Sequence, residues 1–168
     1  GKGDILFAPI SADGRPSPPR ALRATPNSER DAHFSPDGRF VAFVSDESGR
    51  GEVYVASYAG GALGPAVVVS NGGGQQPTWA KDSRRLFFND DPDRVFAATV
   101  SATPVLTASP PVLAYDLKKL RVNRLEWDIM PDGRLLAIQK GEDEDDVLAY
   151  NVVLNWFDEL RAKAPVKK

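Results

Sequence analysis

An internal repeat is the feature that most constrains the fold of this chain. Three segments align without gaps, and each places one tight turn between two apolar runs: AHFSPDGRFVAF (32–43), PTWAKDSRRLFF (77–88) and WDIMPDGRLLAI (127–138). The equivalent residues Phe34, Trp79 and Ile129 are separated by 45 and 50 residues. A period of this length, with four short apolar runs inside it, is typical of the blades of a β-propeller.

The chemistry of the turns supports this interpretation. In Ser35-Pro36-Asp37-Gly38, the proline presets φ, and the glycine accepts the left-handed conformation that closes the reversal. The second copy has Ser83 where glycine is expected, which predicts a strained or altered turn. The runs that follow each turn are apolar on both faces, as expected for strands that are covered on both sides.

The predicted fold class is therefore all-β: a β-propeller fragment of about three four-stranded antiparallel blades with a short C-terminal helix. A single partial domain over 1–168 is expected to contain the following units: outer strands of one blade (1–25), two blades (31–70 and 76–115), a partial blade (124–155) and the helix (156–163). Because a ring needs at least about four blades, the strands do not close. The chain is expected to be part of a larger propeller, with a homodimer through open blade edges as the alternative.

Composition excludes several classes of function. The chain has no cysteine and one histidine, and it contains no G-x-S-x-G elbow and no phosphate-binding loop, so it is predicted to have no cofactor, no metal site and no enzymatic activity. The net charge is −2, which argues against a nucleic-acid partner. No run reaches about 18 apolar residues, so membrane insertion is not expected. His33 is interpreted as a packed or hydrogen-bonded structural side chain on an innermost strand.

Acidic residues gather in the loops expected on one face of the disc, while arginines occupy the turns on the other. The candidate binding residues in these loops are Asp46, Glu47, Asp90, Asp91, Asp93, Glu142 and Asp143. Two interpretations stay open: ordinary solvated loops, or an acidic face that attracts a cation or a basic protein or peptide. The run 142–146 lacks the spaced oxygen ligands of a calcium loop, so no metal is predicted there.

Residues 33–58, HFSPDGRFVAFVSDESGRGEVYVASY, resemble the WD40-like repeat of TolB-type propellers. The ending NVVLNWFDELRAKAP (151–165) resembles the C-terminal end of bacterial receptor-like Ser/Thr protein kinases that carry such a propeller. These resemblances imply a non-catalytic protein- or ligand-binding module. The alternatives are the extracytoplasmic sensor domain of such a kinase or the accessory propeller of a peptidase. They also imply a periplasmic or extracytoplasmic location, with the cytoplasm as the alternative.

Overall fold

The computed structural model describes residues 3–130 and 132–139, and its regular elements are almost all β-strands. The strands form four antiparallel sheets that follow the repeats of the sequence. The predicted fold class, a fragment of a β-propeller, is confirmed. The predicted C-terminal helix and the candidate residues Glu142 and Asp143 lie outside the described residues.

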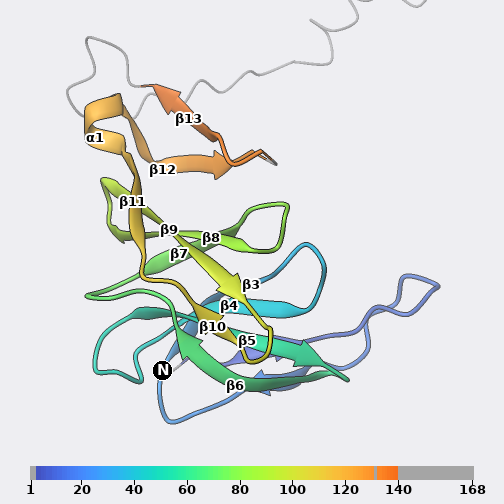
Figure 1. Cartoon of the computed structure of the whole chain (residues 1–168). Helices are drawn as coiled ribbons and strands as arrows, with labels where there is room; N and C mark the ends of the chain where they lie inside the picture. Colours follow the sequence, from blue (N-terminus) through green and yellow to red (C-terminus); the bar gives the residue numbers. More distant parts are fainter. Residues whose placement is uncertain (1–2, 131, 140–168) are drawn as a thin grey trace, which may run out of the picture.

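The four sheets are named blades 1 to 4 in chain order (Figure 1). Blade 1 pairs β1 (Ile5–Phe7) with β2 (Arg20–Arg23). Blade 2 contains β3 (Glu29–Phe34), β4 (Phe40–Ser45), β5 (Glu52–Ala59) and β6 (Ala62–Val68). Blade 3 contains β7 (Gln75–Trp79), β8 (Arg85–Asp91), β9 (Arg94–Ser101), β10 (Thr107–Ala108) and β11 (Val112–Asp116). A short helix, α1 (Leu117–Leu120), leads to blade 4, which pairs β12 (Val122–Ile129) with β13 (Leu135–Gln139).

The outermost strand of blade 3 is divided in two. Thr107 of β10 pairs with Ser101 near the end of β9, whereas Val112 of β11 pairs with Ala97 nearer its beginning. Pro110 and Pro111 lie between the two pieces. Because proline has no N–H to donate, it interrupts a ladder of hydrogen bonds and is tolerated only at such an edge.

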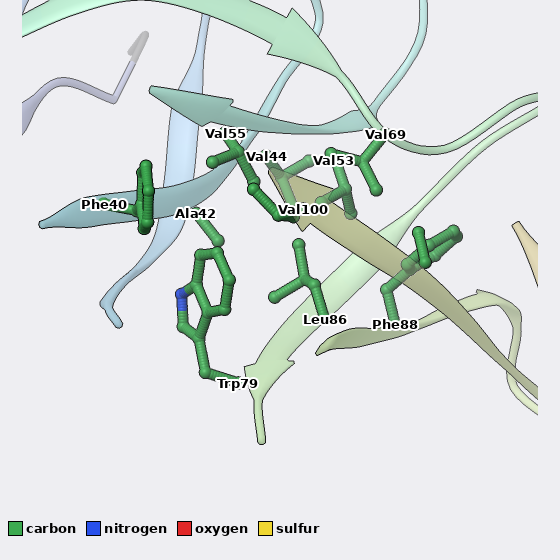
Figure 2. Packing of buried hydrophobic residues seen from close by; sticks show 11 residues of the cluster. Phe40, Ala42, Val44, Val53, Val55, Val69, Trp79, Leu86, Phe88 and Val100 are labelled. Carbon is green, nitrogen blue, oxygen red and sulfur yellow. The ribbon is translucent and has the colours of Figure 1, made fainter. Parts of the chain in front are cut away.

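The main core lies between blades 2 and 3 (Figure 2). The rings of Phe40 and Trp79 stack with their centroids 6.1 Å apart. Leu86 and Phe88 of blade 3 belong to the same buried cluster as Val44 and other side chains of β4 and β5. Side chains of β4 alternate between this core and a second one against blade 1, so every residue of β4 is buried. The prediction of strands covered on both faces is confirmed for this strand.

Blade 4 differs from the other blades in register. Phe34 pairs with Val41 in blade 2 and Trp79 with Leu86 in blade 3, but Ile129 pairs with Leu135. The turn of blade 4 is thus one residue shorter than those of blades 2 and 3. A slip of one residue moves each side chain of a strand to the opposite face. Consequently Leu135 packs toward blade 3, although the sequence alignment makes it equivalent to Phe40 rather than to Val41.

The outer faces of the terminal blades carry exposed apolar side chains. Leu6 of blade 1 is 62% exposed, and Leu136 and Ile138 of blade 4 are 61% and 59% exposed. Their neighbours Ile5 and Leu135 face inward, onto blades 2 and 3 respectively. The apolar patterning of these strands therefore supplies one face that the neighbouring blade covers and one that no described residue covers.

Candidate functional site

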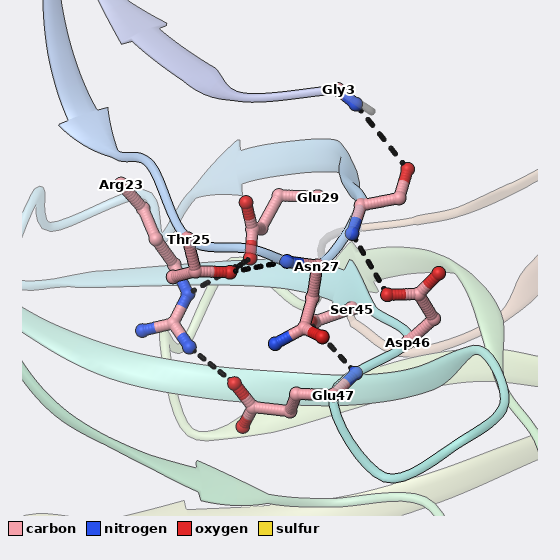
Figure 3. Close-up of polar contacts among 9 residues, drawn as sticks. Gly3, Arg23, Thr25, Asn27, Glu29, Ser45, Asp46 and Glu47 are labelled. Carbon is pink, nitrogen blue, oxygen red and sulfur yellow. Dashed lines mark hydrogen bonds and ion pairs between the residues drawn. The ribbon is translucent and has the colours of Figure 1, made fainter. Parts of the chain in front are cut away.

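The first predicted acidic loop follows β4 (Figure 3). Its two carboxylates contact groups of neighbouring segments. Asp46 Oδ1 accepts a hydrogen bond of 2.8 Å from the backbone N–H of Ser28. Glu47 forms an ion pair with Arg23, which comes from β2 of the preceding blade. The guanidinium of Arg23 also lies over the ring of Phe43, 4.9 Å from its centroid. These contacts tie the loop of blade 2 to blade 1.

The second acidic loop, between β8 and β9, has a similar arrangement. Arg94 Nη2 lies 2.6 Å from Asp90 Oδ2, and Arg94 Nε lies 3.3 Å from Asp91 Oδ2. Asp93 contributes its backbone carbonyl, which accepts a hydrogen bond from the N–H of Leu117 at the start of α1. In each described acidic loop, at least one carboxylate therefore pairs with an arginine that was not predicted from the sequence.

The turns at the opposite end of the blades pair an aspartate with an arginine. The distances from Nε to Oδ2 are 2.7 Å for Arg39 and Asp37, 2.9 Å for Arg85 and Asp82, and 2.7 Å for Arg134 and Asp132. Burial alone would raise the pKa of Asp37, but hydrogen bonds from Ser35 and Arg39 lower this pKa to about 2. The sequence suggested that acidic loops lie at one end of the blades and basic turns at the other. At both ends, residues of opposite charge offset these charges locally. Binding by the predicted loop residues stays a prediction.

A buried carboxylate, which the sequence analysis did not single out, organises the loop between blades 2 and 3. Glu52 Oε1 accepts hydrogen bonds from the N–H groups of Gly72 and Gly73 at 3.1 and 2.9 Å and from Arg50 Nε at 2.8 Å. Glu52 Oε2 accepts a hydrogen bond from the hydroxyl of Ser70. Burial would raise the pKa of Glu52, but the hydrogen bonds from Ser70, Arg50 and the two glycines lower it below its ordinary value. This glutamate fixes the loop and is not free to bind a ligand.

A cavity of about 300 Å³ lies against the innermost strands, and we call it the channel-side pocket. Its lining comes from three successive blades: Asp31 and His33 of β3, Gln76 and Thr78 of β7, and Trp127 of β12. Because one blade alone supplies only part of this lining, the pocket exists only where the blades stack. Its volume is at the lower end of the range usual for small-ligand sites.

Two of the residues that line the channel-side pocket have strained backbones. Asp31 and Gln76 adopt φ of 52° and 53°, and each lies within an irregularity of its strand, before the pairs that begin at His33 and Thr78. A left-handed non-glycine residue costs about 1–2 kcal/mol, and such strain concentrates at functional sites. Both residues stand three positions before the aromatic residue of their repeat, which is the sequence signal that would have identified them.

His33 is exposed in this pocket, so the expectation of a packed histidine was wrong. Most residues of its strand are exposed, and no further layer of the described residues covers them. Trp79 does pack in the core, and its Nε1 donates a hydrogen bond of 3.2 Å to the backbone carbonyl of His33. Trp127 is half-buried, and it contributes both to the core of blades 3 and 4 and to the pocket.

Within residues 3–130 and 132–139, no group of three histidine, aspartate or glutamate side chains is arranged to hold a metal ion. In the same part of the chain, no helix is long and apolar enough to cross a bilayer.

Comparison with protein-family models and with curated proteins finds no match. Among solved structures, a luciferin-regenerating enzyme is similar over 80% of this chain and 48% of its own, with 17% identity and a TM-score of 0.53. A putative TolB from Agrobacterium tumefaciens (15% identity) matches 80% of this chain and 53% of its own, with a TM-score of 0.44. TolB from Acinetobacter baumannii (14% identity) matches 83% and 44% of the two chains, also with a TM-score of 0.44. The chain spans about half the length of these structures.

The comparison with the luciferin-regenerating enzyme corrects one prediction. The absence of catalytic motifs and the resemblance to binding propellers predict no enzymatic activity. That expectation is contradicted, because a structure of similar fold is an enzyme. The physical reason is that catalysis depends on side chains placed on a fold and not on the fold itself. At 17% identity the likeness concerns the fold alone.

Proposed function

We propose that this chain is a binding module whose channel-side pocket receives a basic side chain of a protein or peptide partner. One observation carries the proposal: the pocket contains the carboxylate of Asp31, which forms no ion pair with any described residue. The carboxylates of Glu47 and Asp90, in contrast, are already paired with Arg23 and Arg94. An unpaired carboxylate in a concave site is a natural partner for an ammonium or guanidinium group.

The other pocket residues suit the same kind of ligand. Trp127 offers an aromatic ring, against which a cation is attracted by about 0.5–2 kcal/mol. Gln76 and Thr78 add an amide and a hydroxyl that can orient a peptide group. A small number of polar groups around an apolar surface is the usual composition of a ligand site.

The predicted acidic loops lie at the same end of the blades as Asp31. Glu29, two residues before Asp31, pairs with Ser45, directly before the loop that holds Asp46 and Glu47. Gln75, beside Gln76, pairs with Asn89, directly before Asp90. We propose that these loops contribute secondary contacts to a basic partner beyond the pocket. Their field is weakened by their own arginines and screened beyond about 8 Å at physiological salt.

The proposal is tested by titrating the chain with short lysine- and arginine-containing peptides while tryptophan fluorescence is recorded. Asp31→Asn should weaken binding about tenfold, because a charge-assisted contact contributes about 1.5–3 kcal/mol. Trp127→Phe should remove the spectral change. Asp13→Asn, in an exposed turn of blade 1, is the matched control and should leave binding unchanged. Equal binding of acidic peptides, or full affinity in Asp31→Asn, would contradict the proposal.

The cellular setting is proposed from the sequence resemblances. They favour an extracytoplasmic module, within either a TolB-like protein or the sensor region of a receptor kinase. The chain matches about half the length of similar structures. A role for it within a longer protein is therefore also a proposal. Both settings are compatible with a pocket that captures a basic segment.

A further inference from the structure

A second cavity, of about 350 Å³, lies at the other end of the blades, where the turns of blades 2 and 3 meet the end of β9. We call it the inter-blade pocket. Its polar lining consists of Arg39, Ser83, Arg84, Thr99, Ser101 and Thr103. It shares no residue with the channel-side pocket. The lining contains two guanidinium groups and four hydroxyl groups but no carboxylate, so it presents mainly hydrogen-bond donors and positive charge.

The two arginines reach the inter-blade pocket because the repeat places them there. Arg39 and Arg84 occupy the same position in the turns of blades 2 and 3. Arg39 is oriented in advance, because its Nε donates to Asp37 and its guanidinium lies over the ring of Phe40, 5.4 Å from the centroid. That contact leaves its two terminal nitrogens available and offsets part of its charge. Arg84 forms no ion pair within the described part of the chain.

Ser83 provides a buried hydroxyl at the base of these arginines. The residue is 4% exposed, and its Oγ accepts a hydrogen bond of 3.0 Å from the N–H of Asp37 in the neighbouring blade. The hydroxyl proton has no acceptor among the described residues. Ser83 also adopts φ of 56°, a strained conformation that holds the turn of blade 3 against that of blade 2. A buried hydroxyl that donates to no described residue, beside an arginine without an ion pair there, can donate to an acceptor atom of a ligand.

The geometry points to a binding site for a phosphorylated small molecule in the inter-blade pocket, with its phosphoryl group held by Arg84, Arg39 and Ser83. A phosphate ester carries nearly two negative charges near neutral pH and three terminal oxygens. These oxygens can accept hydrogen bonds from Arg84, Arg39 and the hydroxyl of Ser83, which the turns of blades 2 and 3 bring together. A single carboxylate has only two coplanar oxygens, too few to contact Arg84, Arg39 and Ser83 together. The volume leaves room for several atoms beyond the phosphoryl group.

The experiment is an NMR titration of the chain with inorganic phosphate, glycerol 3-phosphate and succinate, following the backbone and arginine side-chain signals. Saturable shifts at Arg84 and Ser83 are expected with the two phosphates, and glycerol 3-phosphate should bind more tightly because it fills more of the cavity. Arg84→Gln should weaken this binding about tenfold. Arg134→Gln, at the same turn position of blade 4 and paired with Asp132 as Arg39 is with Asp37, is the matched control and should retain full affinity.

Three results would overturn the inference: no saturable binding of either phosphate, affinity unchanged in Arg84→Gln, or succinate bound as tightly as glycerol 3-phosphate. Melting temperatures of both variants are recorded in parallel. Because Arg84 and Arg134 are exposed, neither substitution is expected to affect folding. Failure here does not affect the channel-side pocket, which is probed with basic peptides and different variants.

Discussion

The apolar side chains on the two faces of the repeat are buried to different extents in blade 2 and in blade 4. In β4 the apolar side chains on both faces are buried, because blade 1 covers one face and blade 3 covers the other. In β13 Leu135 packs inward, whereas Leu136 and Ile138 are more than half exposed. Similar sequence therefore gives a sealed interface in one place and an open face in the other. The difference shows that a blade supplies half of each interface and depends on its neighbour for the rest.

The largest expected effect contrasts a side chain of the sealed interface with one of the open face. Leu86 is fully buried between blades 2 and 3, whereas Leu136 is 61% exposed on blade 4. Leu86→Ala should lower the free energy of unfolding by about 3 kcal/mol, because it removes buried methyl groups and leaves a cavity. Leu136→Ala should change it by less than about 0.5 kcal/mol. Urea denaturation of the two variants measures both values, and similar losses would show that the outer face is covered.

The features that blades 2 and 4 share could be predicted from the sequence, and the register in which they differ could not. The turns at Ser35–Gly38 and its repeats were predictable because proline, aspartate and glycine act locally. The both-sided apolar run of β4 was predictable for the same reason. The register of blade 4 was not, because the aligned repeats would pair Ile129 with Leu136, and the structure pairs it with Leu135. Turn length in a hairpin is set by backbone geometry as well as by residue type.

The sites were predicted less well than the fold. The acidic loop residues were found as a pattern, but their partners Arg23 and Arg94 were not, because Arg23 belongs to the preceding blade. The channel-side pocket needs side chains from three strands that are far apart in the sequence. Its members Asp31 and Gln76 share a position in the repeat, but the strand irregularities that place them in the pocket depend on strand pairing. Pairings of this kind depend on how the blades stack.

An intermediate effect on stability is expected at Glu52, which holds the loop between blades 2 and 3. Glu52→Gln should lower the free energy of unfolding by about 2 kcal/mol at neutral pH, because it weakens charge-assisted hydrogen bonds in a buried site. Since folding lowers the pKa of Glu52 below its ordinary value of 4.5, its contribution is complete above pH 4.5. It is lost as the pH falls through the lowered pKa. The stability difference between wild type and Glu52→Gln should therefore shrink in acid.

Urea midpoints of the wild type and Glu52→Gln, measured across this pH range, test the expectation. Glu47→Gln is the control, because Glu47 is more exposed and its pair with Arg23 should contribute less than about 1 kcal/mol. A difference between wild type and Glu52→Gln that stays constant down to the lowest pH would mean that the ionised carboxylate is not what stabilises the loop.

The smallest expected effect separates the two roles of Ser83 in the contact between blades 2 and 3. Its hydroxyl accepts a hydrogen bond from Asp37 N–H across the interface, while its backbone adopts a φ of 56°. Ser83→Ala keeps the strained backbone and loses the hydrogen bond, so the free energy of unfolding should fall by about 1 kcal/mol. Ser83→Gly loses the same bond but relieves the strain, because glycine adopts positive φ readily, and it should be nearly neutral. Equal losses in the two variants would show that the turn is unstrained, and no loss in Ser83→Ala would show that the hydrogen bond contributes nothing to the contact between the blades.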